Sequence, residues 1–157
     1  SKRRGRDNGG RLKMKLSTRT RYGIRAMVDL AAHYRNKPVL IREIAKRQKI
    51  SVNYLEQIML SLKKAGIVES LSGAKGGYIL TKKPEDIRVT GIVEVLEGSL
   101  SPVSCIDHKN LCGREKNCPA RSLWIKVRKN IKDVLDATTL EDLAENKEEK
   151  KADIYQI

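Results

Sequence analysis

Apolar side chains recur at helical spacing through the first third of the chain. After Thr18 they fall at every fourth residue and predict a helix, which stops at 36–38 because proline cannot continue it. A second, short helix is predicted over 41–48. Ser51 is a good N-cap for a third helix, and Gly66 closes that helix. Two short helices joined by a tight turn, after a longer first helix, predict a helix-turn-helix.

A β-hairpin is predicted next. Two runs rich in β-forming residues, 67–71 and 78–80, flank a glycine-rich tip. A hairpin directly after a helix-turn-helix is a wing. Thr90 is expected to cap one more short helix, over 92–97. The predicted fold is therefore mainly α: residues 14–98 form a winged helix-turn-helix with a small β-hairpin wing.

A long amphipathic helix is predicted over 120–137. Its apolar positions form one stripe: Leu123, Val127, Ile131, Val134 and Leu135. Such a stripe needs a partner, and a second copy of the helix in a homodimer is the simplest one. The alternative is that the helix packs only on its own winged domain. Residues 138–157 are expected to form a short helix, which begins with a capping-box pattern, and a charged tail.

Basic charge is concentrated in the N-terminal half of this chain of 157 residues and net charge +14. Residues 1–13 hold six Lys or Arg against one Asp, residues 14–90 hold sixteen against six acidic residues, and residues 91–157 hold eleven against twelve. The distribution points to nucleic acid or another anionic surface, and the alternative is a solvated basic face. Residues 1–13 are interpreted as a disordered basic leader or an expression remnant.

The chain has no run of about 18 apolar residues and no signal-peptide pattern at its start, so no membrane span is expected. Its cysteines are odd in number and clustered, which argues against a disulfide framework. The expected compartment is the cytoplasm.

The start of the third helix is expected to read DNA bases in the major groove. The polar residues at this end are Ser51, Asn53, Tyr54, Glu56 and Gln57. Gln suits adenine and Glu suits cytosine, whereas Tyr54 can alternatively belong to the core. Lys75 at the wing tip is placed to reach a minor groove or the backbone. Phosphate contacts are expected at the start of the first helix, from Lys15, Thr18, Arg19 and Arg21. A homodimer implies double-stranded DNA with a pseudo-palindromic operator.

All three cysteines fall in the segment 99–119, at Cys105, Cys112 and Cys118. Thiols gathered in a polar loop suggest a soft metal or an iron–sulfur cluster. Zn²⁺ in a structural Cys3His site is an alternative, although zinc sites usually have shorter gaps between ligands. A thiol redox enzyme is a third possibility, but the chain has no Cys-x-x-Cys motif and no βαβ pattern. A regulator rather than an enzyme is therefore predicted.

Several motifs together closely resemble the IscR-type winged-helix regulators of bacteria. They are Arg21-Tyr22-Gly23, Ser51-Val52-Asn53-Tyr54-Leu55-Glu56-Gln57, Gly76-Gly77-Tyr78-Ile79-Leu80, Val95-Leu96-Glu97-Gly98, the three cysteines and Leu123-Trp124. The resemblance implies a homodimeric transcription factor that holds an iron–sulfur cluster, changes its DNA binding with the state of the cluster, and controls cluster-assembly genes. It also implies operator contacts from Ser51, Asn53, Tyr54 and Gln57, and a role for Glu56 in choosing between DNA sites.

The chain departs from that family's pattern at two places. Ser72 stands where many relatives have a wing arginine, which leaves Lys75 as the charge there. Arg121 stands where the family has a histidine ligand, and arginine cannot lose its proton to bind a metal. His108 is the first candidate for the missing ligand, followed by Asp107 and Glu115. The expected cofactor is a [2Fe–2S] cluster in preference to a [4Fe–4S] cluster.

Two other branches of the family have different patterns. The CymR branch, a repressor of cysteine metabolism, is similar through Ser101-Pro102-Val103, Leu123-Trp124-Ile125 and Asp136-Ala137-Thr138-Thr139-Leu140, but it lacks the three-cysteine loop. The nitric-oxide sensors use an Asp early in the first helix, and Thr20-Arg21-Tyr22 offers none.

Overall fold

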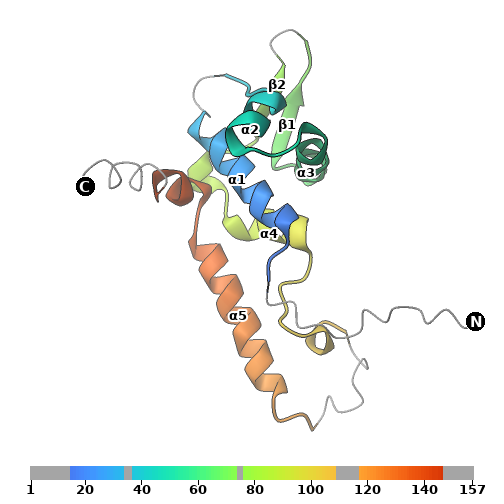
Figure 1. The fold of residues 1–157 in the computed structure, drawn as a ribbon. Helices are drawn as coiled ribbons and strands as arrows, with labels where there is room; N and C mark the ends of the chain where they lie inside the picture. Colours follow the sequence, from blue (N-terminus) through green and yellow to red (C-terminus); the bar gives the residue numbers. More distant parts are fainter. Residues whose placement is uncertain (1–14, 34–36, 74–75, 109–116, 147–157) are drawn as a thin grey trace, which may run out of the picture.

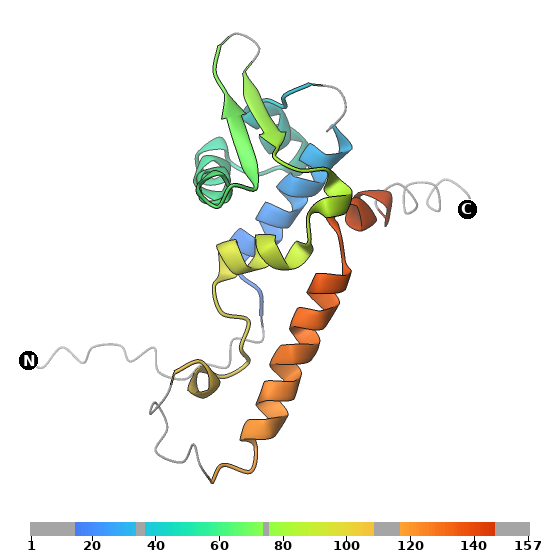
Figure 2. The ribbon, with the colours of Figure 1, turned by 180° about the vertical axis from the view of Figure 1, so that it is seen from behind.

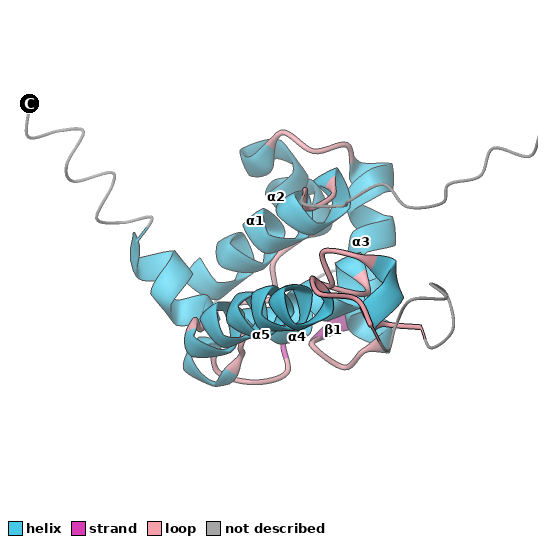
Figure 3. Cartoon of the chain, turned by 90° about the horizontal axis from the view of Figure 1, so that it is seen from below, coloured by secondary structure: helices cyan, strands magenta, loops and turns pink. Residues whose placement is uncertain are grey.

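The computed structural model describes residues 15–33, 37–73, 76–108 and 117–146, and it is mainly helical (Figure 1). The elements are α1 (Thr18–Ala32), α2 (Ile41–Gln48), α3 (Val52–Lys64), β1 (Val68–Leu71), β2 (Gly77–Leu80), the 3₁₀ turn η1 (Pro84–Asp86), α4 (Val89–Glu97), the 3₁₀ turn η2 (Ser104–Ile106) and α5 (Arg121–Ala137). A further short helix covers 140–146. Figure 3 shows how little of the described chain is strand.

The predicted helix-turn-helix is confirmed, and local capping defines its ends. The hydroxyl of Ser51 accepts from the backbone N–H of Tyr54 at 3.3 Å and caps α3. At the other end Gly66 has φ +77°, and its N–H donates to the carbonyl of Lys63, while the N–H of Ile67 donates to the carbonyl of Leu62. These two bonds form a Schellman motif, so Gly66 ends α3 as the sequence predicts.

The first helix ends earlier than predicted. It runs to Ala32, with His33 as its C-cap, and the ring Nδ1 of His33 lies 2.8 Å from the carbonyl of Asp29. The imidazole thereby satisfies a carbonyl of the last turn, which has no helical partner. The predicted end fell at 36–38, and residues 34–36 lie outside the described residues.

A buried carboxylate ties α1 to α2. Asp29 is 2% exposed and accepts two bonds from Arg47, at 2.9 and 2.7 Å, and one from Gln48 at 3.0 Å. Burial raises the pKa of Asp29, but the hydrogen bonds from Arg47 and Gln48 and the positive charge of Arg47 outweigh burial and hold the pKa below its ordinary value. This ion pair fixes how the first two helices cross.

The hydrophobic core lies between α1, α3 and α4. Gly23 lets α1 and α4 approach closely, because a Cβ there would lie 2.1 Å from Leu96 Cδ1 and 3.3 Å from Ile58 Cγ2. Met27, Leu55 and Ile58 are fully buried in this core. The three helices therefore form one rigid unit that carries the wing.

The wing is a hairpin in which β1 pairs antiparallel with β2, with Val68 opposite Leu80 and Leu71 opposite Gly77. A third piece of strand joins it, since Val39 exchanges two backbone bonds with Tyr78, at 3.0 and 2.8 Å. Gly77 has φ +144°, and a Cβ there would lie 2.7 Å from the carbonyl oxygen of Val39. Glycine is therefore needed where the wing crosses the strand before α2.

Thr90 does not cap α4, which corrects the prediction. The helix begins at Val89, whose N–H donates to the carbonyl of Thr138 at 3.0 Å. Thr90 is buried inside the helix, and its hydroxyl donates to Asp136 of α5. A backbone bridge between Arg88 and Thr139, far apart in sequence, therefore sets the start of α4.

The last short helix begins with a capping box, one residue later than the predicted pattern at 138–141. The N–H of Thr139 donates to Asp142 at 2.9 Å, and the N–H of Asp142 donates to the Thr139 hydroxyl at 3.1 Å. Leu140 is fully buried in the core of the winged unit. This anchor fixes the C-terminal end of α5 against the winged unit.

From its C-terminal end, which this anchor holds, α5 extends away from the winged unit (Figures 1 and 2). None of its 17 residues is buried. Leu123 is 52% exposed, and Val134 is 66% exposed. The predicted apolar stripe is thus present, with two members exposed and the other three half-buried within one chain. Within the described part of the chain, no helix is long and apolar enough to cross a membrane.

Candidate nucleic-acid interface and cysteine segment

The start of α3 presents the predicted base-reading residues to solvent. Asn53, Glu56 and Gln57 are exposed. Ser51 is also exposed, but its hydroxyl is engaged as the N-cap of α3. Three long polar side chains therefore project from the first turns of this helix, as direct readout in a major groove requires.

Tyr54 differs from its neighbours because it is half-buried. It packs against the core, and its ring meets that of Tyr22 edge to face, with centroids 6.0 Å apart. The guanidinium carbon of Arg25 lies 5.1 Å above the Tyr22 ring. The ring of Tyr54 thus positions α3 on α1. The hydroxyl end of its side chain remains available for the predicted contact with DNA.

Glu56 lies close enough to the wing for its charge to act on Tyr78. Burial raises the pKa of Tyr78, on β2, and the negative charge of Glu56 raises it further. An acidic residue thus lies where α3 and the wing come together. No ion pair to Glu56 is present within the described residues.

The start of α1 already holds an anion. The carboxylate of Glu97, at the end of α4, accepts from the N–H of Ser17 at 3.0 Å, from the Ser17 hydroxyl at 2.8 Å and from the Thr20 hydroxyl at 2.5 Å. An internal carboxylate thus lies at the N-cap of α1, beside the place where phosphate contacts are predicted.

The cations predicted around the α1 start are arranged in different ways. Arg19 is half-buried and donates to the hydroxyl of Ser61 on α3, so it connects two helices. Arg21 is exposed and donates to Thr18 at 3.2 Å. Lys15 and Thr18 are exposed as well. Lys75, the predicted wing contact, lies outside the described residues.

Arg121 connects both ends of the cysteine segment. Its side-chain Nη1 donates to the carbonyl of Cys105 at 3.3 Å, and its backbone N–H donates to the carbonyl of Cys118 at 3.3 Å. Cys105 and Cys118 are free thiols and half-buried. Cys112 lies outside the described residues. The arginine that replaces the family's histidine thus contacts the backbone of two of the three cysteines.

The candidates for a fourth ligand differ in availability. The side chain of His108 is exposed. Asp107 accepts from the hydroxyls of Ser99 and Ser101 and from Arg128 of α5. Glu115 lies outside the described residues. Among the described residues there is no group of three or more His, Cys, Asp or Glu side chains that could hold a metal ion.

The Asp107 network joins the cysteine segment to α5. Arg128 Nη1 lies 3.3 Å from Asp107 Oδ1 and also donates to the carbonyl of Ile106 at 3.4 Å. Burial raises the pKa of Asp107, but hydrogen bonds from Ser101 and Ser99 and the charge of Arg128 hold it below its ordinary value. The sequence does not predict this contact, because no local pattern pairs residues 21 positions apart.

Residues 16–146 match the family model named Rrf2 and described as an iron-dependent transcriptional regulator. The chain belongs to the Rrf2 family. The HTH-type transcriptional regulator CymR of Bacillus subtilis is 43% identical over 131 residues, which are 83% of this chain and 90% of that protein.

Two solved structures of Rrf2-type proteins support the same assignment. The structure of CymR, the global cysteine regulator of B. subtilis, has a TM-score of 0.73 at 42% identity and covers 85% of this chain and 98% of its own. The structure of T. potens IscR has a TM-score of 0.73 at 44% identity, with 87% and 90% covered. The predicted winged-helix fold, the resemblance to this family and the prediction of a regulator rather than an enzyme are confirmed. Rrf2 regulators bind DNA, typically as dimers.

Proposed function

We propose that this Rrf2 protein reads a pseudo-palindromic operator with the start of α3. The exposed Asn53, Glu56 and Gln57 face outward from one helix end and supply donors and acceptors for base edges. Tyr54 and Arg19 hold that helix on α1, so the reading residues are presented on a rigid support. The basic N-terminal half adds phosphate affinity that falls with salt.

The proposed active form is a homodimer joined through α5. The largely exposed Leu123 and Val134 on a helix with no buried residue support this role. In a two-fold interface, the apolar stripe of each copy would cover the stripe of the other. The spacing between the two α3 helices, and hence between operator half-sites, would then depend on how α5 leaves the winged unit.

We further propose that Cys105, Cys112 and Cys118 hold an iron–sulfur cluster, with His108 as the first candidate for the fourth ligand. The contact of Arg121 with the backbone carbonyls of both Cys105 and Cys118 carries the proposal, because it connects the main chain at two free, half-buried cysteines, and thiolates are the soft donors that such clusters require. When bound, the cluster would supply a group whose redox state and presence respond to iron and oxidants, and a [2Fe–2S] type is preferred.

The segment is connected to both functional parts of the chain. It begins two residues after Glu97, which caps α1, and its Asp107 accepts from Arg128 of α5. A change in the segment would therefore reach the base-reading unit through α1 and the dimer helix through Arg128. Under this proposal the regulator senses cluster status in the cytoplasm and controls cluster-assembly genes.

The test is a metal and sulfide assay on anaerobically purified protein. We expect bound iron, acid-labile sulfide and a red-brown colour with visible charge-transfer bands. Cys105→Ala, Cys112→Ala and Cys118→Ala should each bleach the colour, and His108→Ala should alter the spectrum if His108 is a ligand. A chain that stays colourless after reconstitution with iron and sulfide sinks the cluster proposal, and zinc without sulfide would favour a structural zinc site.

A repressor of cysteine metabolism of the CymR type is the second candidate. The 43% identity to CymR over most of the chain favours it, and so does the anchor formed by Thr138, Thr139 and Leu140, which lies in the stretch that resembles that branch. In that case the three Cys→Ala variants should leave operator affinity unchanged. Footprinting of wild-type and variant protein on the same duplex separates the two candidates.

A further inference from the structure

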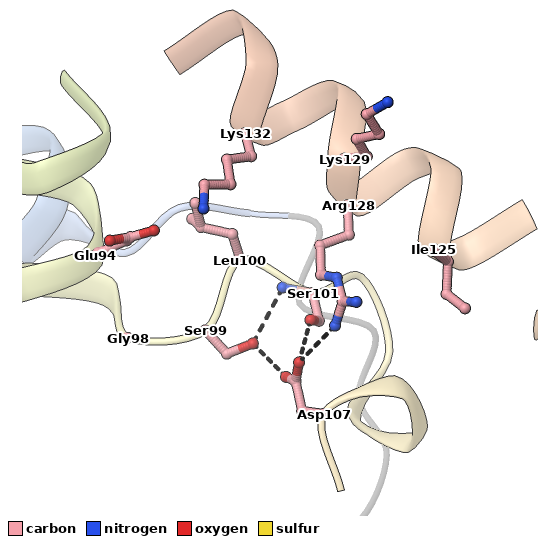
Figure 4. A pocket seen from close by; sticks show the side chains of 10 residues that line it. All are labelled: Glu94, Gly98, Ser99, Leu100, Ser101, Asp107, Ile125, Arg128, Lys129 and Lys132. Carbon is pink, nitrogen blue, oxygen red and sulfur yellow. Dashed lines mark hydrogen bonds and ion pairs between the residues drawn. The ribbon is translucent and has the colours of Figure 1, made fainter. Parts of the chain in front are cut away.

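A cavity of about 680 Å³ lies between α4, the segment 98–101 and α5 (Figure 4). This volume is within the range that small-molecule sites occupy. Its apolar surface comes from Leu100 and Ile125, and charged side chains stand on both of its helical walls. All of its lining residues belong to the described part of the chain.

The two walls carry opposite charges. Glu94 lies on α4, whereas Arg128 and Lys132 lie one turn apart on the same face of α5. Figure 4 shows Glu94 and Lys132 reaching into the space between the helices. Within the described residues, neither of these two side chains makes a hydrogen bond or an ion pair. Both are free to bind a ligand.

Arg128 keeps donors for a ligand as well. Among the residues that the structure describes, only its Nη1 is engaged, by Asp107 Oδ1 and the Ile106 carbonyl, and a guanidinium has five N–H donors. Asp107 also lines the cavity, but it already accepts from Ser99, Ser101 and Arg128. The groups still available are therefore the cations of α5, of which Arg128 and Lys132 share one face with Lys129 beside them, and a single carboxylate on α4.

We propose that this cavity binds a free α-amino acid with an apolar side chain. The carboxylate of the ligand binds between Arg128 and Lys132, and its ammonium binds Glu94 on the opposite wall. The apolar side chain lies against Leu100 and Ile125. A zwitterion is the ligand class that satisfies opposite charges on facing walls without leaving either one desolvated and unpaired.

The proposed site is compatible with a dimer. Ile125, Arg128 and Lys132 are spaced by three and four residues and share one face of α5. The apolar stripe that includes Val127 and Val134 lies about half a turn away at 100° per residue. Pairing of two α5 helices through the stripe therefore leaves the cavity accessible.

A ligand here would bridge the winged unit and the dimer helix. Glu94 moves with α4, and Arg128 and Lys132 move with α5, so binding favours the arrangement in which the two helices hold their present distance. The inference goes beyond the proposed function and does not depend on the cysteine segment, so either can fail without the other.

The experiment is calorimetric titration of the full-length protein with L-leucine. Two matched probes each lack one charge: 3-methylbutylamine has no carboxylate, and 4-methylpentanoate has no ammonium. We expect saturable binding of leucine and a loss of affinity of about tenfold or more for each probe, since every 1.4 kcal/mol is a factor of ten. L-alanine, which has only a methyl group for the apolar wall, should bind more weakly than leucine.

Lys132→Met and Glu94→Gln should each weaken leucine binding by about tenfold, whereas Lys126→Met, on α5 but outside the cavity lining, should leave it unchanged. Circular dichroism of each variant checks that the fold is intact. Equal affinity for leucine in wild type and Lys132→Met, equal affinity for leucine and 3-methylbutylamine, or no saturable heat up to roughly 10 mM leucine would each overturn the proposal.

Discussion

Glu97, the last residue of α4, accepts from both the backbone N–H and the hydroxyl of Ser17, at 3.0 and 2.8 Å. The two residues are 80 positions apart, and their contact joins the end of the fourth helix to the start of the first. One carboxylate therefore accepts from the N-cap of α1 and also stands just before the cysteine segment.

Replacement of Glu97 by Ala should lower the free energy of unfolding by about 1–2 kcal/mol. The change removes a carboxylate at a helix start and leaves the buried Thr20 hydroxyl without this acceptor. Urea unfolding followed by circular dichroism measures the loss. Glu94→Ala, one turn earlier on the same helix, is the control and should change stability little. Equal stability of the two variants would contradict the capping role.

Replacement of Asp29 by Asn should cost about 3 kcal/mol, because it breaks a buried ion pair between α1 and α2. The pKa of Asp29 is lowered in the folded state, so its stabilisation is present above the unfolded value of about 3.9 and is lost as pH falls through the folded value. When unfolding is measured from pH 7 downward, the free energy of unfolding of Asp29→Asn should therefore fall less steeply than that of the wild type. Asp133→Asn, on exposed α5, should follow the wild-type profile.

The packing of α1 on α4 predicts opposite effects for two glycines. Gly23→Ala should destabilise the protein by about 1–3 kcal/mol, since the new methyl group meets Leu96 in the core. Gly91→Ala has open space around it inside α4 and should stabilise by about 0.5–1 kcal/mol. Thermal unfolding of both variants tests this. A Gly23→Ala protein that is more stable than wild type would show that Leu96 repacks freely.

Val134→Glu should convert the proposed dimer into a monomer. Val134 is 66% exposed in the single chain, so a charge there does not disturb the fold. Between two paired α5 helices the same charge would lose its water, which costs free energy. Sedimentation equilibrium measures the state. Lys129→Glu, on the opposite face of α5, should remain dimeric. A Val134→Glu protein that stays dimeric would move the interface away from the stripe.

Gln57→Ala should weaken binding to the specific operator by about 1–3 kcal/mol and relax the choice of base at one position. Its side chain is exposed on α3, so the fold should be unaffected. Lys64→Ala, at the far end of the same helix, should instead weaken binding to all duplexes alike. It should also reduce the dependence of log affinity on log salt concentration. Anisotropy titrations with specific and scrambled duplexes at several salt concentrations separate the two effects.

Local patterns were sufficient for the helices, the wing and several caps. Ser51, Gly66 and Thr139 act within a few residues of themselves, so their roles can be predicted from sequence spacing alone. The apolar stripe of α5 is equally local, because helical periodicity places its members on one face. These features determine that the chain is a winged helix with an uncovered long helix.

Contacts between distant segments were decided only in the tertiary structure. A cap was predicted at Thr90, but folding brings the carbonyl of Thr138 to the N–H of Val89, and it also brings Glu97 to Ser17 at the start of α1. Arg128 likewise meets Asp107 only because α5 returns beside η2. Such pairings depend on how helices pack in space, and side-chain periodicity along one element carries no information about its distant partners.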